Sequence, residues 1–443
     1  MKKIFVIGAG RSAPTLIKYL LDQSAENDWK VTVGDVSEEL AIKRVGRHEN
    51  GKAIAFDVLD EKQRKVEISS ADVVVSMLPP SMHIDVAKDC ISLKKHMTTA
   101  SYVSKEMKEL DPAAKKAGVV LLNEIGVDPG LDHLSSMEII DAIKAKGGKL
   151  QSFESFTGGL IAPESDNNPW NYKFTWNPRN VVLAGQGVVK FIQEGKYKYI
   201  PYHKVFSRIE KLTIPEYGTF EGYANRDSLK YREIYGLEAI PTLYRGTLRR
   251  PGFCKAWDLF VQLGATDDTY VMEGTETMTH KDFINSFVLY HPGDSVKLKV
   301  AYHMQVSIES DEMEKLDWLG IFDDTPVGIK KGTPAQILQH ILEKKWTLIK
   351  DDKDMIIMIH RVFYHHEGKL KKLTSHLAVK GDDSTYTAMA KTVGLPLGIA
   401  TKFVAKEIIS NPGVILPISK EVYVPSLEEL RKYGIAFHEK EGD

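Results

Sequence analysis

Short apolar runs alternate with amphipathic stretches through the first 125 residues of the chain. Brief β-branched runs bounded by polar residues or glycine are typical of buried strands, and stretches with a single apolar face are typical of helices packed on a sheet. The predicted strands are Ile4–Ile7, Val31–Val33, Ala53–Phe56, Val73–Leu78, His96–Ala100 and Val119–Leu122, and the helices are Thr15–Leu21, Glu38–Gly46 and Ile84–Leu93. This alternation predicts right-handed crossovers and a mostly parallel sheet.

The pattern changes at Leu150, where aromatic residues become denser and loops lengthen. Residues 228–346 read as mainly helical, and Met355–His360 with Lys371–Val379 read as a strand hairpin. A helical stretch, Ser384–Ser410, then precedes a proline-containing tail that we expect to be extended. The sequence therefore predicts an α/β protein of three bodies: 1–127, with about 390–443 packing back on it; 128–227 with 350–390; and a mainly helical body, 228–349.

Composition excludes several classes of protein. Hydrophobic residues make up 43% and charged residues 27%, as in globular chains, and the net charge of −1 argues against nucleic acid as a partner. Two cysteines, Cys90 and Cys254, are too few for a disulfide framework or a thiolate metal site, which favours the reducing cytoplasm. No apolar run approaches the length of about 18 residues that a transmembrane helix needs, so we expect no membrane association.

A glycine-rich turn follows the first strand and opens the first helix. The residues Gly8, Ala9, Gly10, Arg11, Ser12 and Ala13 form G-x-G-x-x-A in the context of a dinucleotide-binding βαβ unit. The first glycine permits the turn, the second lets the backbone approach a pyrophosphate, and Ala13 allows close packing of helix on strand. Because glycines also serve plain turns, a purely structural role is the alternative.

Two further carboxylates are candidates for binding the dinucleotide. Asp35 ends the second strand, at the place of the acidic residue that binds ribose hydroxyls, which favours NAD over NADP. A strand-end cap is the alternative for Asp35, and Arg11 complicates the choice because a guanidinium can bind the extra phosphate of NADP. Asp57 and Val58, after the third strand, are suited to flank an adenine.

Polar clusters beyond the first sheet suggest a second ligand. Thr99–Tyr102 ends a strand, Asn123–His133 leads into a helix, and two arginine-bearing loops follow at Asn225–Ser228 and Arg245–Arg249. Two guanidinium groups, Arg226 and Arg249, suit a substrate with several carboxylates, because arginine pairs bidentately with carboxylate. Ordinary surface pairing is the alternative for each arginine.

At these clusters the sequence resembles the saccharopine reductases, the L-glutamate-forming saccharopine dehydrogenases. The segments that carry the resemblance are Gly8–Ala13, Thr99–Tyr102, Glu124–His133, Gly158–Leu160, Ala162–Glu164, Asn168–Pro169, Tyr172–Phe174, Asn225–Ser228 and Arg245–Arg249. The resemblance implies a variant Rossmann domain, an α+β substrate-binding and dimerisation domain, and a mainly helical domain, working as a homodimer. It also implies the reversible oxidation of saccharopine to glutamate and 2-aminoadipate 6-semialdehyde with NAD or NADP.

The resemblance assigns residues to both ligands. Those expected at saccharopine are Ser101, Tyr102, Asp128, Arg226, Thr247, Leu248 and Arg249. Those expected at the dinucleotide, besides the glycine-rich turn and Asp35, are Asp57, Val58, Ala100, Ser101, Val127, Asp128, Pro129 and Thr175. The chain departs from the family in two places: Thr157 stands where many members have cysteine, and Gly34–Val36 lacks the arginine found in NADP-using members, which again favours NAD.

Asp128 and Tyr102 are the candidate general acid–base groups, acting through water. Helix capping is the alternative for Asp128, strand-end packing is the alternative for Tyr102, and His133 reads more readily as a packed, hydrogen-bonded histidine than as a proton shuttle. No zinc motif is present, and His360, His365 and His366 read as a hairpin edge and tip, so no metal is expected.

Two other functions remain open at this stage. One is a related reductive coupling enzyme such as a carboxynorspermidine dehydrogenase, which would match less well at Asn225–Ser228 and Arg245–Arg249. The other is a non-enzymatic Rossmann protein that senses NAD(H). The sequence does not distinguish a biosynthetic from a catabolic direction, since lysine synthesis and lysine breakdown share the step.

Overall fold

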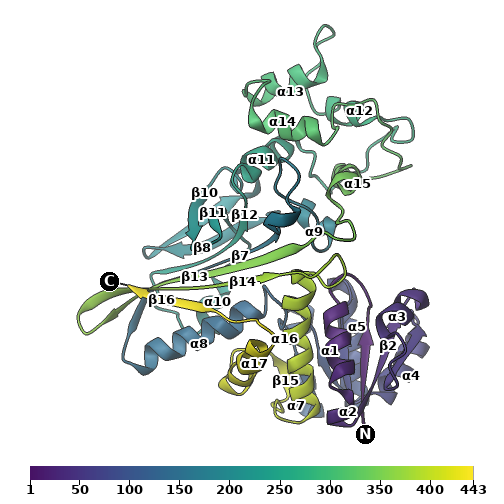
Figure 1. Cartoon of the computed structure of the whole chain (residues 1–443), viewed down its shortest axis with the longest axis vertical. Coiled ribbons are helices and arrows are strands. Elements are labelled where there is room, and N and C mark those ends of the chain that lie inside the picture. The colour runs from purple at the N-terminus through teal and green to yellow at the C-terminus, as the bar shows by residue number, and fades with distance from the viewer. Residues whose placement is uncertain (443) are drawn as a thin grey trace. The chain divides into compact units, whose positions relative to one another are not determined.

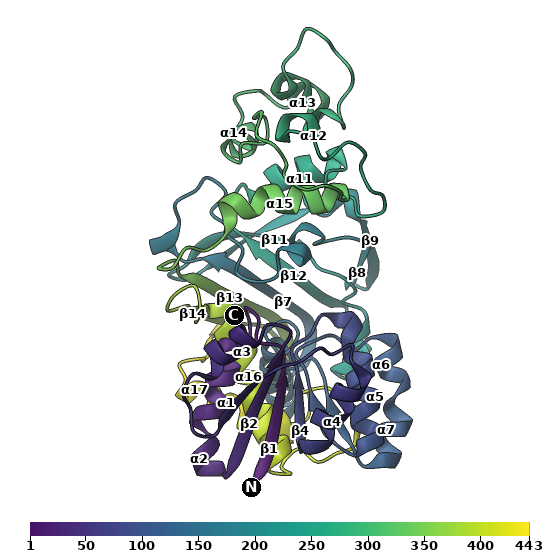
Figure 2. The same cartoon turned by 90° about the vertical axis from the view of Figure 1, so that its right-hand side faces the viewer.

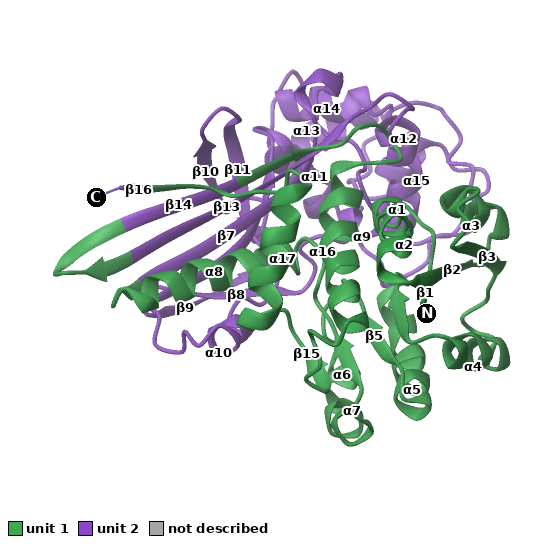
Figure 3. Ribbon diagram, turned by 60° about the horizontal axis from the view of Figure 1, so that its bottom comes forward, with its two compact units in different colours: residues 1–150, 364–371, 377–440 green, residues 151–363, 372–376, 441–443 purple. Residues whose placement is uncertain are grey.

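The computed structural model describes residues 1–442 and divides into two compact units (Figure 3). Unit 1 contains Met1–Leu150, Tyr364–Lys371 and Leu377–Lys440, and unit 2 contains Gln151–Phe363 and Lys372–His376 with the residues from Glu441. Both are α/β, as predicted. The finer division into three domains, with boundaries near 128, 228 and 350, stays a prediction.

Unit 1 is built on a parallel sheet of seven strands, in the order β15-β6-β5-β4-β1-β2-β3. The strands are β1 (Lys2–Ile7), β2 (Trp29–Asp35), β3 (Gly51–Ala55), β4 (Val73–Ser76), β5 (His96–Thr98), β6 (Val120–Leu122) and β15 (Gly413–Ile415). The chain runs outward from β1 to β3 and then returns to β4 on the other side of β1. This reversal creates the switch point at which open α/β sheets bind ligands.

Helices cover both faces of this sheet (Figure 2). One face carries α1 (Pro14–Asp22), α3 (Glu38–Val45) and α16 (Ala388–Ala405), and the other carries α4 (Glu61–Ser70), α5 (His83–Leu93), α6 (Lys105–Glu109) and α7 (Asp111–Ala117). A core that includes Phe5, Val74 and Leu121 lies under the second face. The short α2 (Ser24–Asn27) and the long α8 (Leu131–Ala145) complete the part of unit 1 that precedes residue 150.

The C-terminal segment is integral to unit 1. Helix α16 approaches α1 so closely that a Cβ atom on Gly394 would lie 2.7 Å from the backbone nitrogen of Leu16. The tail after Ser410 is not extended as expected, because α17 (Lys420–Lys432) forms a helix despite Pro425. The proline lies inside the helix, in its second turn, where it removes a single backbone bond, while Val422, Leu427 and other residues of one helix face are buried.

Unit 2 contains most of a mixed sheet of nine strands in the order β10-β11-β12-β7-β13-β14-β16, with β8 paired to β12 and β9 paired to β8 (Figure 1). Their bounds are β7 (Lys149–Ile161), β8 (Val188–Gln193), β9 (Lys196–Pro201), β10 (Ile209–Ile214), β11 (Gly218–Ala224), β12 (Thr242–Arg249), β13 (Asp354–His366), β14 (Lys369–Lys380) and β16 (His438–Gly442). The expected hairpin corresponds to β13 and β14. The expected loop at Arg245–Arg249 is wrong, since these residues lie in β12, where threonine, leucine and tyrosine favour the strand and the paired neighbours β7 and β11 satisfy its backbone.

Helices dominate the rest of residues 228–346, as predicted. They are α10 (Lys230–Ile234), α11 (Phe253–Leu263), α12 (His280–Asn285), α13 (Val296–Met304), α14 (Asp311–Trp318) and α15 (Pro334–Trp346), with α9 (Pro178–Val182) earlier in the chain. Thr333 and Gln336 form the capping box that starts α15. Across residues 1–442, no helix combines the length and the hydropathy needed to cross a bilayer.

Candidate functional site

The turn after β1 leaves its backbone open to a ligand. Gly8 has φ +102°, and a Cβ there would lie 2.8 Å from the carbonyl oxygen of Met77, so a larger residue is excluded. At Gly10, in contrast, a Cβ would meet no atom within 4 Å, and the residue is exposed. Ala13 is buried at the N-cap of α1. The turn therefore fits a dinucleotide pyrophosphate, which needs close backbone approach and free N–H donors.

Asp35 anchors this turn to the end of β2. Its Oδ2 accepts the backbone N–H of Ala9 at 2.8 Å, and its Oδ1 accepts that of Ser37 at 2.9 Å. Arg44 in α3 donates to the carbonyl oxygen of Ala9 at 3.1 Å, which brings a cation to the same turn. Asp35 therefore fixes the backbone of the glycine-rich turn to the end of β2. Its carboxylate oxygens still have lone pairs that can accept hydrogen bonds from ribose hydroxyls.

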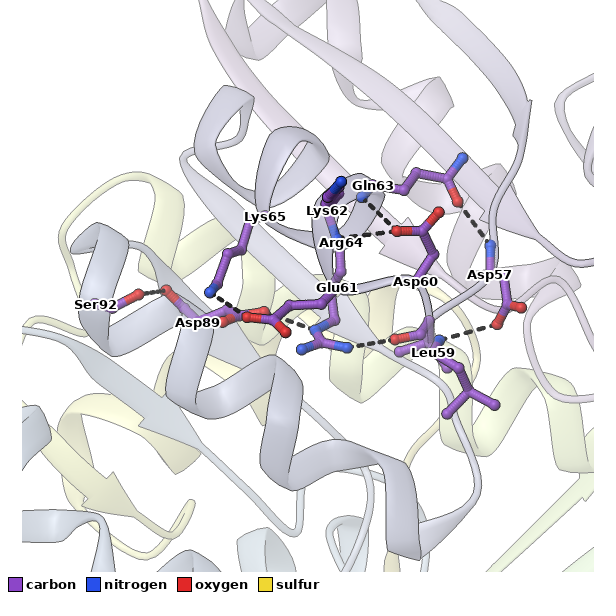
Figure 4. A network of polar contacts seen from close by, with 11 residues as sticks. Asp57, Leu59, Asp60, Glu61, Lys62, Gln63, Arg64, Lys65, Asp89 and Ser92 are labelled. Atoms are coloured by element: carbon purple, nitrogen blue, oxygen red, sulfur yellow. Dashed lines mark hydrogen bonds and ion pairs between the residues drawn. The ribbon is translucent and has the colours of Figure 1, made fainter.

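A buried ion pair holds the turn after β3 (Figure 4). Arg64 Nε donates to Asp89 Oδ2 at 2.6 Å, and Arg64 Nη1 donates to the carbonyl oxygen of Val58 at 2.6 Å. The side chain of Gln63 accepts the backbone N–H of Asp57 at 3.0 Å. The two residues predicted to flank the adenine are therefore fixed by side chains of α4 and α5.

His83 links the ends of β4 and β5. Its Nδ1 lies 2.8 Å from Oγ of Ser76, the last residue of β4, and its Nε2 lies 2.6 Å from Oγ of Ser101, which follows β5. Burial lowers the pKa of His83 to about 4. The ring is therefore neutral near pH 7, so one nitrogen donates and the other accepts, and the Ser101 hydroxyl is held at the carboxyl edge of the sheet.

The two candidate acid–base residues contact each other. The Tyr102 hydroxyl donates to Asp128 Oδ1 at 3.3 Å. The following helix, α8, begins at Leu131, and its N-cap residue is Gly130, so Asp128 lies two positions before the N-cap. The partly exposed carboxylate of Asp128 is oriented by the phenol of Tyr102, and helix capping stays the alternative for this residue.

A buried histidine–carboxylate pair supports the same loop. His133 Nε2 lies 2.9 Å from Glu124 Oε2, and their side chains are 0% and 1% exposed. Glu124 Oε1 also accepts the backbone N–H of Val103 at 3.0 Å, and its own N–H donates to the carbonyl oxygen of Ser101 at 3.1 Å. His133 is thus the packed, hydrogen-bonded histidine that the sequence favours, and the pair fixes the segment that carries Tyr102.

In unit 2, the Arg249 guanidinium is buried among aromatic rings. Its Cζ lies 5.1 Å from the ring centroid of Tyr172, 5.9 Å from that of Tyr223 and 5.3 Å from that of Phe253. Nη1 donates to the carbonyl oxygen of Leu248 at 2.9 Å, whereas Nε has no hydrogen-bond partner. Within residues 1–442, no carboxylate forms an ion pair with Arg249. A buried cation of this kind is suited to bind an anion.

The other substrate candidates of unit 2 differ in exposure. Thr247 is half-buried in β12, two residues before Arg249, and Leu248 is fully buried on the opposite side of the strand. Arg226 is exposed on the turn after β11, at φ 51°. Thr175, expected at the dinucleotide, is 3% exposed, and its hydroxyl has no hydrogen-bond partner.

The predicted residues thus fall into two groups. Unit 1 carries the glycine-rich turn, Asp35, Asp57, Val58, Ala100, Ser101, Tyr102, Val127, Asp128 and Pro129, and unit 2 carries Thr175, Arg226, Thr247, Leu248 and Arg249. Residues 1–442 hold no cluster of three or more histidine, cysteine or acidic side chains placed to bind a metal ion.

Comparison with protein families gives two consecutive matches. Residues 4–122 match the saccharopine dehydrogenase NADP binding domain, and residues 126–435 match the saccharopine dehydrogenase C-terminal domain. The chain belongs to the saccharopine dehydrogenase family. The first match covers the parallel sheet from β1 to β6 and names NADP, whereas the NAD preference expected from Asp35 finds no counterpart in it.

Relatives within the saccharopine dehydrogenase family span the whole chain. The saccharopine dehydrogenase (NADP(+), L-glutamate-forming) of Pyricularia oryzae is 34% identical over 99% of both chains, and that of Saccharomyces cerevisiae is 32% identical over 99% of both. The apo structure of saccharopine dehydrogenase (L-Glu forming) from Saccharomyces cerevisiae superposes with a TM-score of 0.89 at 31% identity and covers 100% of both chains. The mitochondrial alpha-aminoadipic semialdehyde synthase of Rattus norvegicus is 35% identical over 99% of this chain, which spans about half (47%) of that relative's length.

Sequence reasoning missed four residues that the structure makes prominent. His83 lies at the start of α5 with no motif around it, and the Arg64–Asp89 pair joins two helices whose sequences give no sign of the contact. Tyr172 lies in Tyr172–Phe174, one of the segments that carry the family resemblance, and that was the available signal.

Proposed function

We propose that this protein is an L-glutamate-forming saccharopine dehydrogenase of lysine metabolism. It oxidises saccharopine, with water and one NADP or NAD, to glutamate, 2-aminoadipate 6-semialdehyde, the reduced dinucleotide and a proton. The step is reversible. Family membership over the full described chain supports the reaction, and the buried Arg249 is the observation that carries the substrate assignment.

Arg249 supports a substrate with carboxylate groups. A guanidinium buried among aromatic rings without an ion-pair partner is stabilised when a carboxylate binds, because the fork of N–H donors matches the two carboxylate oxygens. Saccharopine has three carboxylates. We assign one to Arg249, with Thr247 and Leu248 beside it in β12, and another to the exposed Arg226.

Unit 1 binds the dinucleotide in this proposal. The glycine-rich turn from Gly8 to Ala13 binds the pyrophosphate, Asp35 the adenosine ribose, and Asp57 with Val58 the adenine. The residues Ala100, Ser101, Val127, Asp128 and Pro129 line the nicotinamide half. The bound dinucleotide supplies the hydride acceptor.

Asp128 and Tyr102 supply the proton chemistry. The secondary amine of saccharopine must be unprotonated before its carbon loses hydride, and Asp128 accepts the amine proton through a water molecule. Loss of hydride from the neutral amine leaves a protonated imine on the substrate. Asp128, oriented by the Tyr102 hydroxyl, releases the first proton to solvent and then accepts a proton from the water that adds to the imine carbon. It returns this proton to the amine nitrogen, and cleavage of the C–N bond releases glutamate and the semialdehyde.

Asp35 bears on the choice of dinucleotide. In this proposal the Asp35 carboxylate repels the 2′-phosphate of NADP, which favours NAD, whereas Arg11 of the glycine-rich turn and Arg44, which donates to Ala9, supply cations for that phosphate. We propose that the protein uses both dinucleotides and prefers NAD.

Formation of reduced dinucleotide from saccharopine tests the function. Absorbance at the wavelength of the reduced nicotinamide is followed with saccharopine and NADP, and then with saccharopine and NAD. We expect turnover with both. Absence of turnover with either dinucleotide, in protein that binds the dinucleotide by calorimetry, contradicts the proposal and leaves a nucleotide sensor or a coupling enzyme for another amine.

The assembly and compartment are also proposals. The resemblance supports a homodimer, which light scattering on the purified chain tests against a monomer of 49.8 kDa. Two buried free cysteines, Cys90 and Cys254, fit a reducing compartment such as the cytoplasm.

A further inference from the structure

We propose that Tyr172 is a specificity-determining residue of unit 2, whose phenol donates a hydrogen bond to the same substrate carboxylate that Arg249 binds. The inference rests on the proposed function, which gives the substrate its carboxylates. It adds a side chain to the recognition of the substrate that the family resemblance does not assign.

The hydroxyl of Tyr172 is buried and has no hydrogen-bond partner. The side chain is 1% exposed and packs against Phe253, Trp346 and Phe174, with ring centroids 5.1–6.2 Å apart. In such an aromatic cluster phenylalanine would pack as well, and the hydroxyl loses its hydration without gaining a bond. An orphaned buried hydroxyl calls for an explanation, and a ligand that accepts its proton provides one.

A second buried donor without a hydrogen-bond partner lies next to Tyr172. Arg249 Nε has no partner, and the guanidinium lies over the Tyr172 ring, 5.1 Å from its centroid. Burial raises the pKa of Tyr172 to about 12, with Arg249 acting in the opposite direction, so the phenol keeps its proton at neutral pH. A neutral O–H and a guanidinium are both donors, which suits a carboxylate and does not suit a cation or an alkyl chain.

The strand register adds polar groups around the two donors. Thr247 pairs with Thr157 of β7 and with Tyr223 of β11, so the three side chains lie on one face of the sheet, and Arg249 follows two residues later on that face. The hydroxyl of Thr157 is also buried without a partner. The face therefore presents a group of hydroxyls beside one guanidinium.

Tyr172→Phe is the informative variant, because it removes only the hydroxyl and keeps the ring under Arg249. Tyr202→Phe is the matched control: burial raises the pKa of Tyr202 to about 12 as well, but its hydroxyl already donates to Thr266 Oγ1 at 2.8 Å. Steady-state kinetics and thermal unfolding are measured for both variants and the parent protein, with and without saccharopine.

We expect Tyr172→Phe to raise the KM for saccharopine about tenfold, with kcat and the KM for the dinucleotide within about twofold of the parent. Its midpoint of thermal unfolding without ligand should equal or exceed that of the parent, and the upward shift caused by saccharopine should shrink. Tyr202→Phe should show the reverse: a lower midpoint without ligand and an unchanged KM.

The inference is overturned if Tyr172→Phe has the same KM for saccharopine as the parent and the same rise in unfolding midpoint on adding saccharopine. It is also overturned if Tyr172→Phe and Tyr202→Phe raise the KM for saccharopine equally. The proposed function is judged separately, because it fails only when the parent protein does not turn over saccharopine. If the parent is active and Arg249→Met loses saccharopine binding while Tyr172→Phe does not, the role of Tyr172 alone is refuted.

Discussion

His83 Nε2 lies 2.6 Å from Ser101 Oγ, and this bond ties the start of α5 to a residue at the carboxyl edge of the sheet. The other ring nitrogen lies 2.8 Å from Ser76 Oγ at the end of β4. The histidine is 3% exposed, so protonation would bury a charge between two neutral hydroxyls. The geometry holds only for the neutral ring, and this makes the stability of unit 1 depend on pH.

The first prediction is a loss of stability below pH 6.5 that depends on His83. In the unfolded chain the imidazole takes up a proton near its ordinary pKa of 6.5, whereas in the folded protein burial lowers that pKa to about 4. The contribution of His83 is therefore complete above about pH 6.5 and falls by up to about 1.4 kcal/mol per pH unit between there and pH 4. Urea unfolding at pH 7, 6 and 5 should show a smaller decline in His83→Gln than in the parent. The exposed His291 provides the control, and an identical decline in His83→Gln and the parent contradicts the prediction.

The second prediction concerns the choice of dinucleotide. Asp35→Ser removes the charge near the adenosine ribose while a hydroxyl remains to accept the N–H of Ala9. We expect the ratio of kcat/KM for NAD to that for NADP to fall about tenfold, since repulsion of the 2′-phosphate is lost. Asp57→Asn should leave the ratio unchanged. An unaltered ratio in Asp35→Ser argues against the assignment.

The third prediction separates catalysis from helix capping at Asp128. Because Gly130, and not Asp128, is the N-cap residue of α8, Asp128→Asn should leave the midpoint of thermal unfolding nearly unchanged. The loss of a general base should lower kcat about 10²–10⁴-fold. Tyr102→Phe, which removes the donor 3.3 Å from Asp128, should lower kcat less. A variant Asp128→Asn that retains full kcat would remove the residue from the mechanism.

The fourth prediction is that Arg249 lowers the stability of the ligand-free protein and is needed to bind saccharopine. Arg249→Met has a similar length and no charge, so the ligand-free protein should be as stable as the parent or more stable, by about 1–3 kcal/mol in urea unfolding. The KM for saccharopine should rise at least about 100-fold, since a carboxylate loses a bidentate partner. A large loss of stability without a change in KM would make Arg249 a structural residue.

The fifth prediction concerns the turn at Asp57 and Val58. Asp89→Leu leaves Arg64 buried without its partner, and we expect a loss of about 3–5 kcal/mol in unfolding free energy. The KM for the dinucleotide should rise in the variant at a temperature where it is folded, because Arg64 no longer holds the carbonyl of Val58. Glu61→Gln breaks the exposed pair with Lys65 on the same helix and should change neither quantity noticeably. If the two variants changed the unfolding free energy and the KM for the dinucleotide equally, the buried Arg64–Asp89 pair would not be what holds this turn.

The parallel sheet of unit 1 was predictable because each strand is a short β-branched run followed by an amphipathic helix. The strand β12 was not, because two arginines in five residues resemble an exposed loop, and only the pairing with β7 and β11 buries them. Helix α17 was missed for a related reason. Pro425 signals a break, while the apolar face that overrides it is visible only once α17 packs against α8 and α16.

The candidate site divides in the same way. The glycine-rich turn and Asp35 are local motifs with a fixed relation to the first two strands, so the sequence reveals them. His83 and Arg64 act through partners on other elements, and Tyr172 acts through the absence of a hydrogen-bond partner for its hydroxyl. Neither property leaves a local pattern, and burial in three dimensions is needed to see it.

The position of α16 and β15 in unit 1 has a consequence for how the protein is made. Thr98 and Thr401 share a buried hydrogen bond of 2.8 Å across 303 positions of sequence, and β15 adds the last strand beside β6. The ribosome synthesises β1 to β6 long before these partners exist, so the apolar face of α1 stays uncovered while most of unit 2 is translated. The parallel sheet of unit 1 is therefore completed late in synthesis, and the unfinished unit exposes apolar surface during that interval.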